Sequence, residues 1–198
     1  EYQAMFNQAM SEGTRNATPG IAEAGDFARF TWVVDVGGGD GTLLAGVLAA
    51  HPHLRGTVFD THDGMQAAPG TLTRAGLADR AAAEAGDFFA AVPSDGDAYV
   101  LCRILHDWDD AAAGRLLERC RAAMPASARL LVVDKLLPER VADNPSAIFL
   151  DLDMLVEVGG RQRSAAEYRT LLARHGFHLE EVVDRAPASS VLVARPVT

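Results

Sequence analysis

The sequence predicts an α/β fold with a doubly wound, mostly parallel sheet and an antiparallel terminal hairpin strand. Three observations predict it. Short β-rich runs alternate with segments of helix length, which is the pattern of βαβ units. The runs at 98–104 and 128–134 are almost continuously apolar, as expected of strands that are buried on both faces. A glycine cluster at 37–41 follows the first apolar run, where a strand would turn into a helix.

The elements are expected in the following order. Residues 1–30 form a helical lead-in, with helices at 2–10 and 21–30 and a loop at 11–20, and residues 31–198 form the main domain. Strands are expected at 32–36, 56–59, 81–85, 98–104 and 128–134, with a terminal hairpin at 179–185 and 190–194. Helices are expected at 42–50, 64–75, 110–124, 146–158 and 164–175, with Gly176 as the C-cap of the last.

Composition restricts the function classes. The chain has 198 residues, of which 48% are apolar and 23% charged, so it suits one globular domain. It has 18 basic and 27 acidic residues, and its net charge of −9 makes nucleic acid a poor partner. No apolar run approaches the roughly 20 residues that span a membrane. The two cysteines, Cys102 and Cys120, cannot form a disulfide framework and agree with a reducing, cytoplasmic setting.

The glycine cluster predicts a cofactor site. Asp35, Gly37, Gly39 and Gly41 occupy alternate positions, and a helix is expected directly after them. Glycines permit positive φ and let a ligand approach backbone N–H groups at the helix N-terminus. A dinucleotide fingerprint would need its third glycine at position 42 or 44, where this chain has Thr and Leu. The acid two residues before the first glycine instead suits an ammonium group, which favours S-adenosylmethionine over NAD, the ligand of a rival oxidoreductase hypothesis.

Two further segments complete the expected nucleoside site. Asp60 ends the second strand, where a carboxylate can accept both ribose hydroxyls. Taken alone, Asp60 fits better as an ordinary acidic residue at a strand end, but the glycine loop before it favours the ribose role. Asp87 and Phe88 follow the third strand, so Asp87 could accept from an adenine amino group while Phe88 packs on the ring.

A histidine follows the fourth strand. His106 lies next to Trp108 and three acids, and a neutral imidazole can take a proton near neutral pH. The alternative is a structural cluster at a helix N-terminus, with Asp109 or Asp110 as the cap and His106 as a hydrogen-bonding neighbour. Local reasoning leaves the two alternatives open.

Several segments carry a resemblance to a known family. In chain order they are FNQAM at 6–10, DVGGGDG at 35–41, FD at 59–60, GDFF at 86–89, LHDWDD at 105–110, VDKLLP at 133–138, and GGRQRS at 159–164 before EY at 167–168. Together they resemble the cofactor-binding C-terminal domain of S-adenosylmethionine-dependent O-methyltransferases of the caffeic acid O-methyltransferase type. That family includes bacterial enzymes that methylate hydroxyls of aromatic polyketides. The resemblance implies a Rossmann-like methyltransferase sheet, the donor S-adenosyl-L-methionine and the product S-adenosyl-L-homocysteine.

The resemblance also implies roles for individual residues. His106 would remove the proton from an aromatic substrate hydroxyl without a metal, and Met10 would lie beside the substrate ring. Asp134 and Gln162 match the two acids that usually flank this histidine, but Gln162 is uncharged. The positions implied to contact the cofactor are Gly37, Asp60, Asp87, Phe88 and Arg103, beside Asp35 and Gly39 of the glycine loop.

Further expectations concern partners and alternatives. Members of the family carry an N-terminal region that forms a dimer, so the full-length protein is expected to be a homodimer. This chain, which begins at Glu1, is then a fragment with exposed apolar residues on the helix at 146–158. One alternative is a magnesium-dependent methyltransferase of the catechol type, with candidate ligands Asp107, Asp109, Asp110, Asp151 and Asp153. Another is a scaffold or regulator that binds cofactor with little turnover, which Gln162 supports.

Overall fold

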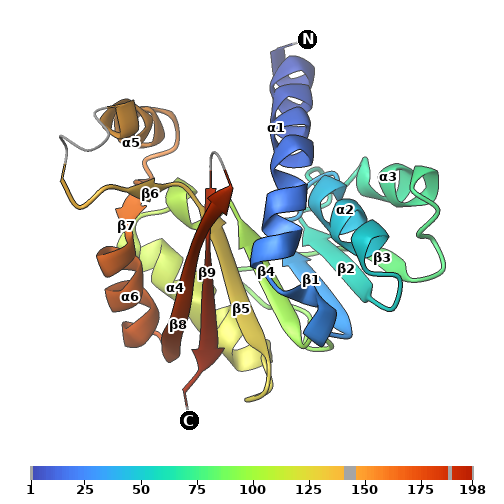
Figure 1. Cartoon of the computed structure of the whole chain (residues 1–198). Coiled ribbons are helices and arrows are strands. Elements are labelled where there is room, and N and C mark those ends of the chain that lie inside the picture. The colour runs from blue at the N-terminus through green and yellow to red at the C-terminus, as the bar shows by residue number, and fades with distance from the viewer. Residues whose placement is uncertain (1, 141–145, 187–188, 198) are drawn as a thin grey trace.

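The computed structural model describes residues 2–140, 146–186 and 189–197, without the side chains of 2–11, 146–148, 150, 153, 157, 185 and 186. One seven-stranded sheet runs through the molecule in the order β3-β2-β1-β4-β5-β9-β8 (Figure 1). Its strands are β1 (Trp32–Val36), β2 (Arg55–Asp60), β3 (Ala81–Ala85), β4 (Ala98–Cys102), β5 (Arg129–Asp134), β8 (Phe177–Ala186) and β9 (Ser189–Pro196). Neighbouring strands from β3 to β5 are parallel, whereas β9 is antiparallel to both β5 and β8. The predicted fold class is therefore confirmed.

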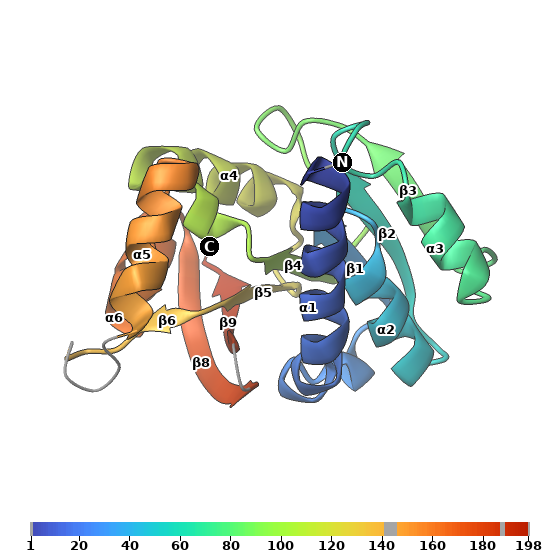
Figure 2. The ribbon, with the colours of Figure 1, turned by 90° about the horizontal axis from the view of Figure 1, so that it is seen from above.

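Helices cover both faces of the sheet. They are α1 (Tyr2–Ala24), α2 (Thr42–Ala50), α3 (Ala68–Arg74), α4 (Asp110–Ala123), α5 (Ser146–Glu157) and α6 (Ala165–Arg174). Viewed from above, α1, α2 and α3 lie on one side of the sheet and α4 on the other (Figure 2). Helix α5 lies apart from these layers, next to a small parallel pair formed by β6 (Leu136–Leu137) and β7 (Arg163–Ser164).

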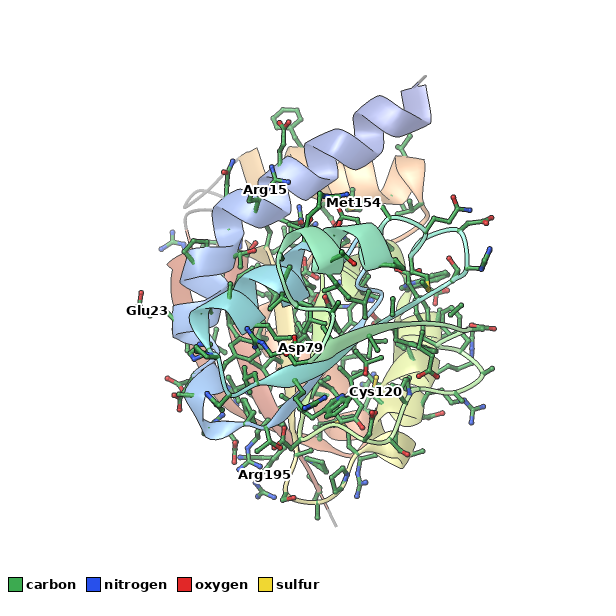
Figure 3. The ribbon with its side chains drawn as sticks, turned by 90° about the vertical axis from the view of Figure 1, so that its right-hand side faces the viewer. Arg15, Glu23, Asp79, Cys120, Met154 and Arg195 are labelled. Atoms are coloured by element: carbon green, nitrogen blue, oxygen red, sulfur yellow. The ribbon has the colours of Figure 1, made fainter. Side chains whose placement is uncertain are left out.

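Strand β5 shows how the sequence fills both cores. Leu131 and Val133 pack in one buried cluster with residues of α1, α2 and α3. Leu130 and Val132 pack in the other, with residues of α4 and α6. Successive side chains of a strand point to opposite faces, so a strand that is apolar at every position must be covered twice. Cys120 of α4 (Figure 3) belongs to this second cluster and is completely buried with a free thiol.

The predicted loop at 11–20 is wrong, because α1 continues through it. Pro19 lies inside this helix. Thr18 is buried and lies against Gly46 of α2, where a Cβ on the glycine would overlap its methyl group. The Thr18 hydroxyl donates to the Thr14 carbonyl at 2.8 Å. Close helix packing thus outweighs the local preference of Gly and Pro for turns.

Several boundaries also differ from prediction, among them those of α1, β4 and α3. Helix α1 ends at Ala24, so the segment predicted as a helix up to residue 30 contains instead a short 3-10 turn at Phe27–Arg29. Strand β4 ends at Cys102 because Arg103 turns into the left-handed region, with φ 57°. Helix α3 begins at Ala68, four residues later than predicted. The pair β6 and β7 was not predicted, because two-residue strands carry no recognisable periodicity.

The C-cap of α6 is His175, and the glycine predicted to end this helix is the next residue. Gly176 follows α6 with φ 82°, a conformation that strains residues with a Cβ. Among the helices of the described part of the chain, none combines the length and the apolar character required to cross a bilayer.

Candidate functional site

Parallel strands place the predicted site residues at one edge of the sheet. Asp35 lies near the end of β1, Asp60 ends β2, and Asp134 ends β5. The turns after β3 and β4 carry Phe88 and His106 at the same edge. In open parallel sheets, ligands bind at the carboxyl ends of the strands. The fold thus brings together segments that are distant in the sequence.

The glycine loop is held against β2 by hydrogen bonds that its backbone N–H groups donate. Gly37, Gly39 and Gly41 all have positive φ, at 74°, 54° and 75°. The Gly37 N–H donates to the Phe59 carbonyl at 2.7 Å, and the Gly39 N–H donates to Asp60 Oδ2 at 2.9 Å. A Cβ on Gly39 would meet no atom within 4 Å, so the loop borders open space there. This geometry leaves room for a ligand to approach the loop backbone.

Asp35 lies beneath this loop and is almost completely buried, with 2% of its surface exposed. Burial, followed by the charges of Asp60 and Asp40, raises its pKa to about 7, although a backbone hydrogen bond from Leu44 opposes the shift. Its Oδ2 atom has no hydrogen-bond partner in the structure. A buried carboxylate oxygen without a donor favours an added cationic or donor group at this position.

Asp87 and Phe88 lie next to Asp60, because the Gly86 N–H donates to the Asp60 carbonyl at 2.8 Å. Asp87 is exposed, and its Oδ1 accepts from the Phe89 N–H at 2.8 Å. The Phe88 ring lies edge-on to Phe89, with centroids 4.9 Å apart, and to Trp108, with centroids 6.2 Å apart. The half-buried ring therefore lines the same edge as the glycine loop.

Arg103 connects this edge to α1. Its positive φ is unusual for a residue with a side chain. Its N–H donates to the Val133 carbonyl at 2.8 Å, and its guanidinium donates to the hydroxyl of Thr14. This contact with α1 is one that the sequence reasoning did not find, because no local pattern relates Thr14 to the fourth strand.

His106 forms a close pair with Asp134. The distance from Nδ1 of His106 to Oδ1 of Asp134 is 2.6 Å, and the side chains are 12% and 0% exposed. Burial lowers the pKa of His106, but the hydrogen bond and charge of Asp134, with the charge of Asp107, raise it above the usual 6.5. With its Nδ1 hydrogen donated to Asp134, the neutral ring keeps the lone pair of Nε2 available for a proton.

Gln162 lies beside the same ring. Its Nε2 is 3.4 Å from Nδ1 of His106, and its Oε1 is buried without a hydrogen-bond partner. The Nδ1 hydrogen is already used on Asp134, so the amide is a neighbour of the ring and not a second strong partner. The structure therefore brings His106, Asp134 and Gln162 together, as the sequence predicted.

A buried arginine fixes the turn that carries His106. Arg163 donates to the carbonyls of Leu105 at 2.7 Å and Trp108 at 2.8 Å, on either side of His106. It also pairs with Asp110 at 2.8 Å. No role was assigned to Arg163 from the sequence. Its charge, within the family segment GGRQRS at 159–164, could have indicated one.

Three acids of the magnesium alternative, Asp109, Asp110 and Asp151, make other contacts. Asp109 caps α4 by accepting from the Ala112 N–H at 2.7 Å, and Asp151 accepts from the Gln162 N–H at 2.7 Å. Asp110 pairs with Arg163. Within the described residues, no group of three or more His, Cys, Asp or Glu side chains has an arrangement suited to a metal ion. The side chains of Asp153 and of Met10, the predicted substrate contact on α1, lie outside those described.

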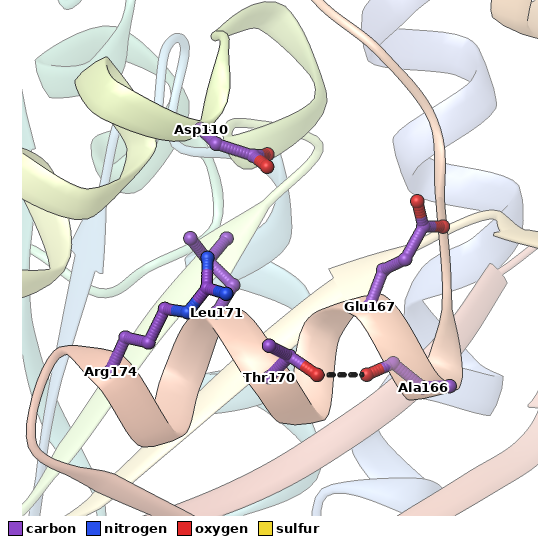
Figure 4. A pocket seen from close by; sticks show the side chains of 6 residues that line it. All are labelled: Asp110, Ala166, Glu167, Thr170, Leu171 and Arg174. Carbon is purple, nitrogen blue, oxygen red and sulfur yellow. Dashed lines mark hydrogen bonds between the residues drawn. The ribbon is translucent and has the colours of Figure 1, made fainter.

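A separate pocket lies between α6 and the first residue of α4 (Figure 4) and has a volume of about 230 Å³. Its lining residues are Asp110, Ala166, Glu167, Thr170, Leu171 and Arg174. It contains none of the predicted catalytic or cofactor-binding residues. The Thr170 hydroxyl donates within the helix to the Ala166 carbonyl at 3.0 Å.

The chain is similar in sequence and in fold to known O-methyltransferases. The chain is 46% identical to O-demethylpuromycin-O-methyltransferase of Streptomyces alboniger, covering 100% of this chain and 54% of the relative. It is 42% identical to the phenazine O-methyltransferase PhzM of Lysobacter antibioticus, with coverage of 100% and 58%. Among solved structures, the neocarzinostatin O-methyltransferase NcsB1, in complex with S-adenosylmethionine and 2-hydroxy-5-methyl naphthoic acid, has a TM-score of 0.89. Its identity is 34%, and the match covers 98% of this chain and 57% of NcsB1.

These relatives are O-methyltransferases, and the chain covers a similar share of each. The chain spans little more than half the length of these relatives. A family model described as the O-methyltransferase domain matches residues 1–178. This match, together with the glycine loop and the His106–Asp134 pair at one edge of the sheet, shows that the chain belongs to the O-methyltransferase domain family.

Proposed function

We propose that the protein transfers a methyl group from S-adenosylmethionine to a hydroxyl of an aromatic small molecule. The observation that carries this proposal is the 2.6 Å contact between His106 and Asp134, at the same sheet edge as the glycine loop and Asp60. A buried histidine held by a carboxylate is suited to accept a proton. The relatives named above include a phenazine O-methyltransferase and an O-methyltransferase in complex with a naphthoic acid, which supports an aromatic acceptor.

The residues present fit the cofactor. The orphaned Oδ2 of Asp35 lies beneath the loop where a cationic ammonium would complete its hydrogen bonding. The open space beside Gly39 would admit the amino-acid part of the ligand. Asp60, half-buried at the end of β2, would accept the ribose hydroxyls. The remaining proposed contacts are Gly37, Asp87 and Phe88 near the nucleoside, and Arg103 directly after β4.

In the proposed mechanism, Nε2 of His106 removes the proton from the substrate hydroxyl. Asp134 keeps the ring in the required tautomer and stabilises the imidazolium that forms. Bound S-adenosylmethionine supplies an activated methyl group on a sulfonium, so alignment and deprotonation are the main requirements. Asp107 Oδ1, 3.4 Å from Nε2, adds negative charge near the protonated ring. The mechanism uses no metal ion, and Met10 would contact the substrate from α1.

The full-length protein is proposed to be a homodimer. Five apolar side chains at and just beyond α5 are exposed, namely Phe149, Leu152, Leu155, Val156 and Val158, with Val156 exposed to 82%. A contiguous exposed apolar face of this kind is typical of an interaction surface. A region outside this chain or a second copy would cover it. The reducing cytoplasm is the proposed location, because Cys102 and Cys120 are both free thiols.

The first experiment is a calorimetric titration of this chain with S-adenosylhomocysteine, with NAD as a parallel ligand and Asp60→Ala as the control. We expect stoichiometric binding that the substitution abolishes, and no binding of NAD. The full-length protein is then assayed for methyl transfer to hydroxylated aromatic compounds, with and without His106→Ala. Loss of a general base costs about 10²–10⁴-fold in rate. Binding without turnover in the full-length wild type would favour the scaffold alternative, for which Gln162 is the supporting residue.

A further inference from the structure

The carboxylate that holds His106 is itself held by a third side chain. Asp134 is completely buried at the end of β5. Its Oδ1 contacts His106 Nδ1 at 2.6 Å and accepts from the Lys135 N–H at 2.9 Å. Its Oδ2 accepts from the hydroxyl of Tyr168 at 2.6 Å. Both oxygens of this carboxylate are therefore satisfied, and each by a specific partner.

Tyr168 is well placed to fix the carboxylate. It lies in the first turn of α6 and is completely buried. A capping box fixes that turn: Ser164 Oγ accepts from the Glu167 N–H, and Glu167 Oε2 accepts from the Ser164 N–H at 2.8 Å. The guanidinium of Arg163 lies 5.8 Å from the centre of the Tyr168 ring. The same arginine, which directly precedes the N-cap of α6, donates to the carbonyls on either side of His106 and so connects the start of α6 to the histidine turn.

The hydroxyl of Tyr168 stays protonated and acts as a hydrogen-bond donor to Asp134. Burial, followed by the charge of Asp134, raises the pKa of Tyr168 well above its usual value of 10. The hydroxyl therefore keeps its proton at any pH at which the protein functions. Without it, Oδ2 of Asp134 would be a buried charged oxygen with no donor, which is costly. Rotation of the Asp134 carboxylate away from its present position would then lower the free energy of this unpaired oxygen.

We propose that Tyr168 is a positioning residue of the proposed methyl transfer. Its hydroxyl holds Asp134 in the orientation that receives Nδ1–H of His106, which directs Nε2 to the substrate. This role rests on the proposed function. It also explains how the short Asp134 can orient the ring although its neighbour Gln162 is uncharged: one carboxylate, fixed at both oxygens, replaces two acids.

The test uses Tyr168→Phe in the full-length protein. We expect kcat to fall about 10–100-fold, as for other residues that hold a catalytic group from behind. The affinity for S-adenosylhomocysteine and the KM of the acceptor should stay unchanged. The limb of the kcat/KM profile that reports His106 should move to lower pH, because the ring loses part of its contact with Asp134. Other charged or titratable groups also act on these three residues. Arg103 and Asp107 act on His106, Cys102 acts on Asp134, and Arg163 acts on Tyr168.

A matched control separates positioning from stability. Tyr99 on β4 is also completely buried, and its hydroxyl donates to the Pro93 carbonyl at 2.9 Å, away from the site. Tyr99→Phe removes the same group from an equally buried side chain, but one whose partner is a backbone carbonyl. It should lower the melting temperature but leave kcat and the pH profile unchanged.

A double-mutant cycle tests the route through Asp134. In the Asp134→Asn background, Tyr168→Phe should cause little further loss of kcat. An equal loss in both backgrounds would overturn the proposal, and so would an unshifted pH profile with normal kcat. If Tyr168→Phe does not fold, the hydroxyl proton of Tyr168 in the wild type is followed by NMR. Its resonance must titrate together with His106, and an invariant resonance would contradict the coupling. Absence of methyl transfer by the full-length wild type would reject the proposed function itself, independently of Tyr168, whereas full activity of His106→Ala would reject His106 as the base.

Discussion

Gly160 lies directly against the backbone that carries His106. A Cβ on Gly160 would overlap the carbonyl oxygen of His106 and come within 2.8 Å of the Asp107 Cα. The next residue, Arg161, donates its N–H to that same carbonyl at 2.9 Å. Together with Arg163, this contact means that the segment before α6 sets the position of the proposed base. Backbone atoms have no flexible end that could move aside.

Gly160→Ala should therefore displace the His106 turn. We expect kcat to fall about 10²-fold, since a misplacement of about 1 Å in a catalytic group has an effect of that size. Binding of S-adenosylhomocysteine should persist, because the glycine loop lies on other strands. Steady-state kinetics and calorimetry of the full-length variant measure both. Gly70→Ala in α3 is the control, since its added methyl would meet only the end of the Arg74 side chain. Normal kcat in Gly160→Ala would show that the turn is not held as described.

The pH dependence of the rate should follow His106. Neutral His106 is the active form, and its pKa lies above 6.5. The value of kcat/KM should thus rise with pH through a value above 6.5. Asp134→Asn removes the charge that raises this pKa, so the limb should move to lower pH while kcat falls by up to about 10⁴-fold. A limb that stays in place in the variant would assign the titration to another group.

The raised pKa of His106 also makes the stability of the fold depend on pH. The protonated ring is favoured more in the folded than in the unfolded state, because its folded pKa is raised. Its contribution to the free energy of unfolding is present below the unfolded pKa and disappears as pH rises through the folded value. Thermal unfolding of wild type and Asp134→Asn at several pH values measures this difference. Equal slopes in the two proteins would contradict it.

Replacing Asp35 should stabilise the ligand-free fold but weaken cofactor binding. A carboxyl whose pKa moves from 3.8 to about 7 costs up to about 4 kcal/mol when ionised in the folded protein. Because the folded state holds the proton more tightly, stability falls as pH rises between these values, and the full cost is present above 7.

Asp35→Asn should therefore raise the melting temperature of the ligand-free chain above neutral pH by several degrees. The same variant should bind S-adenosylhomocysteine more weakly, because the amide cannot pair with an ammonium. Differential scanning calorimetry and titration give the two results. A variant that binds normally would remove Asp35 from the proposed site.

The apolar face of α5 should decide the oligomeric state of the full-length protein. Leu155 is 59% and Val156 is 82% exposed. Leu155→Asp combined with Val156→Asp should convert the proposed dimer to monomers, as measured by sedimentation velocity. Val197→Asp, at an exposed position outside α5, is the control and should leave the dimer intact. An unchanged dimer in the α5 variant would locate the interface elsewhere.

Much of this molecule is determined locally and can be predicted from the sequence. The apolar run of β5, the glycines at 37–41 and the glycine after α6 each act through backbone preferences or burial patterns within a few residues. The family segments in the sequence predicted three residues of the site, His106, Asp134 and Gln162. The structure brings their side chains together. Parallel strands that end at one edge make such convergence a general consequence of the fold.

Other features were decided only by tertiary structure, because their causes lie far away in the sequence. Residues 11–20 are helical because Thr18 packs on Gly46 of α2, and no local rule for Pro or Gly contains that neighbour. The left-handed conformation of Arg103 depends on partners in α1 and β5. Tyr168 reaches Asp134 across 34 positions of chain. Local preference sets which elements form, whereas burial and hydrogen bonding between distant elements decide how the proposed base is held.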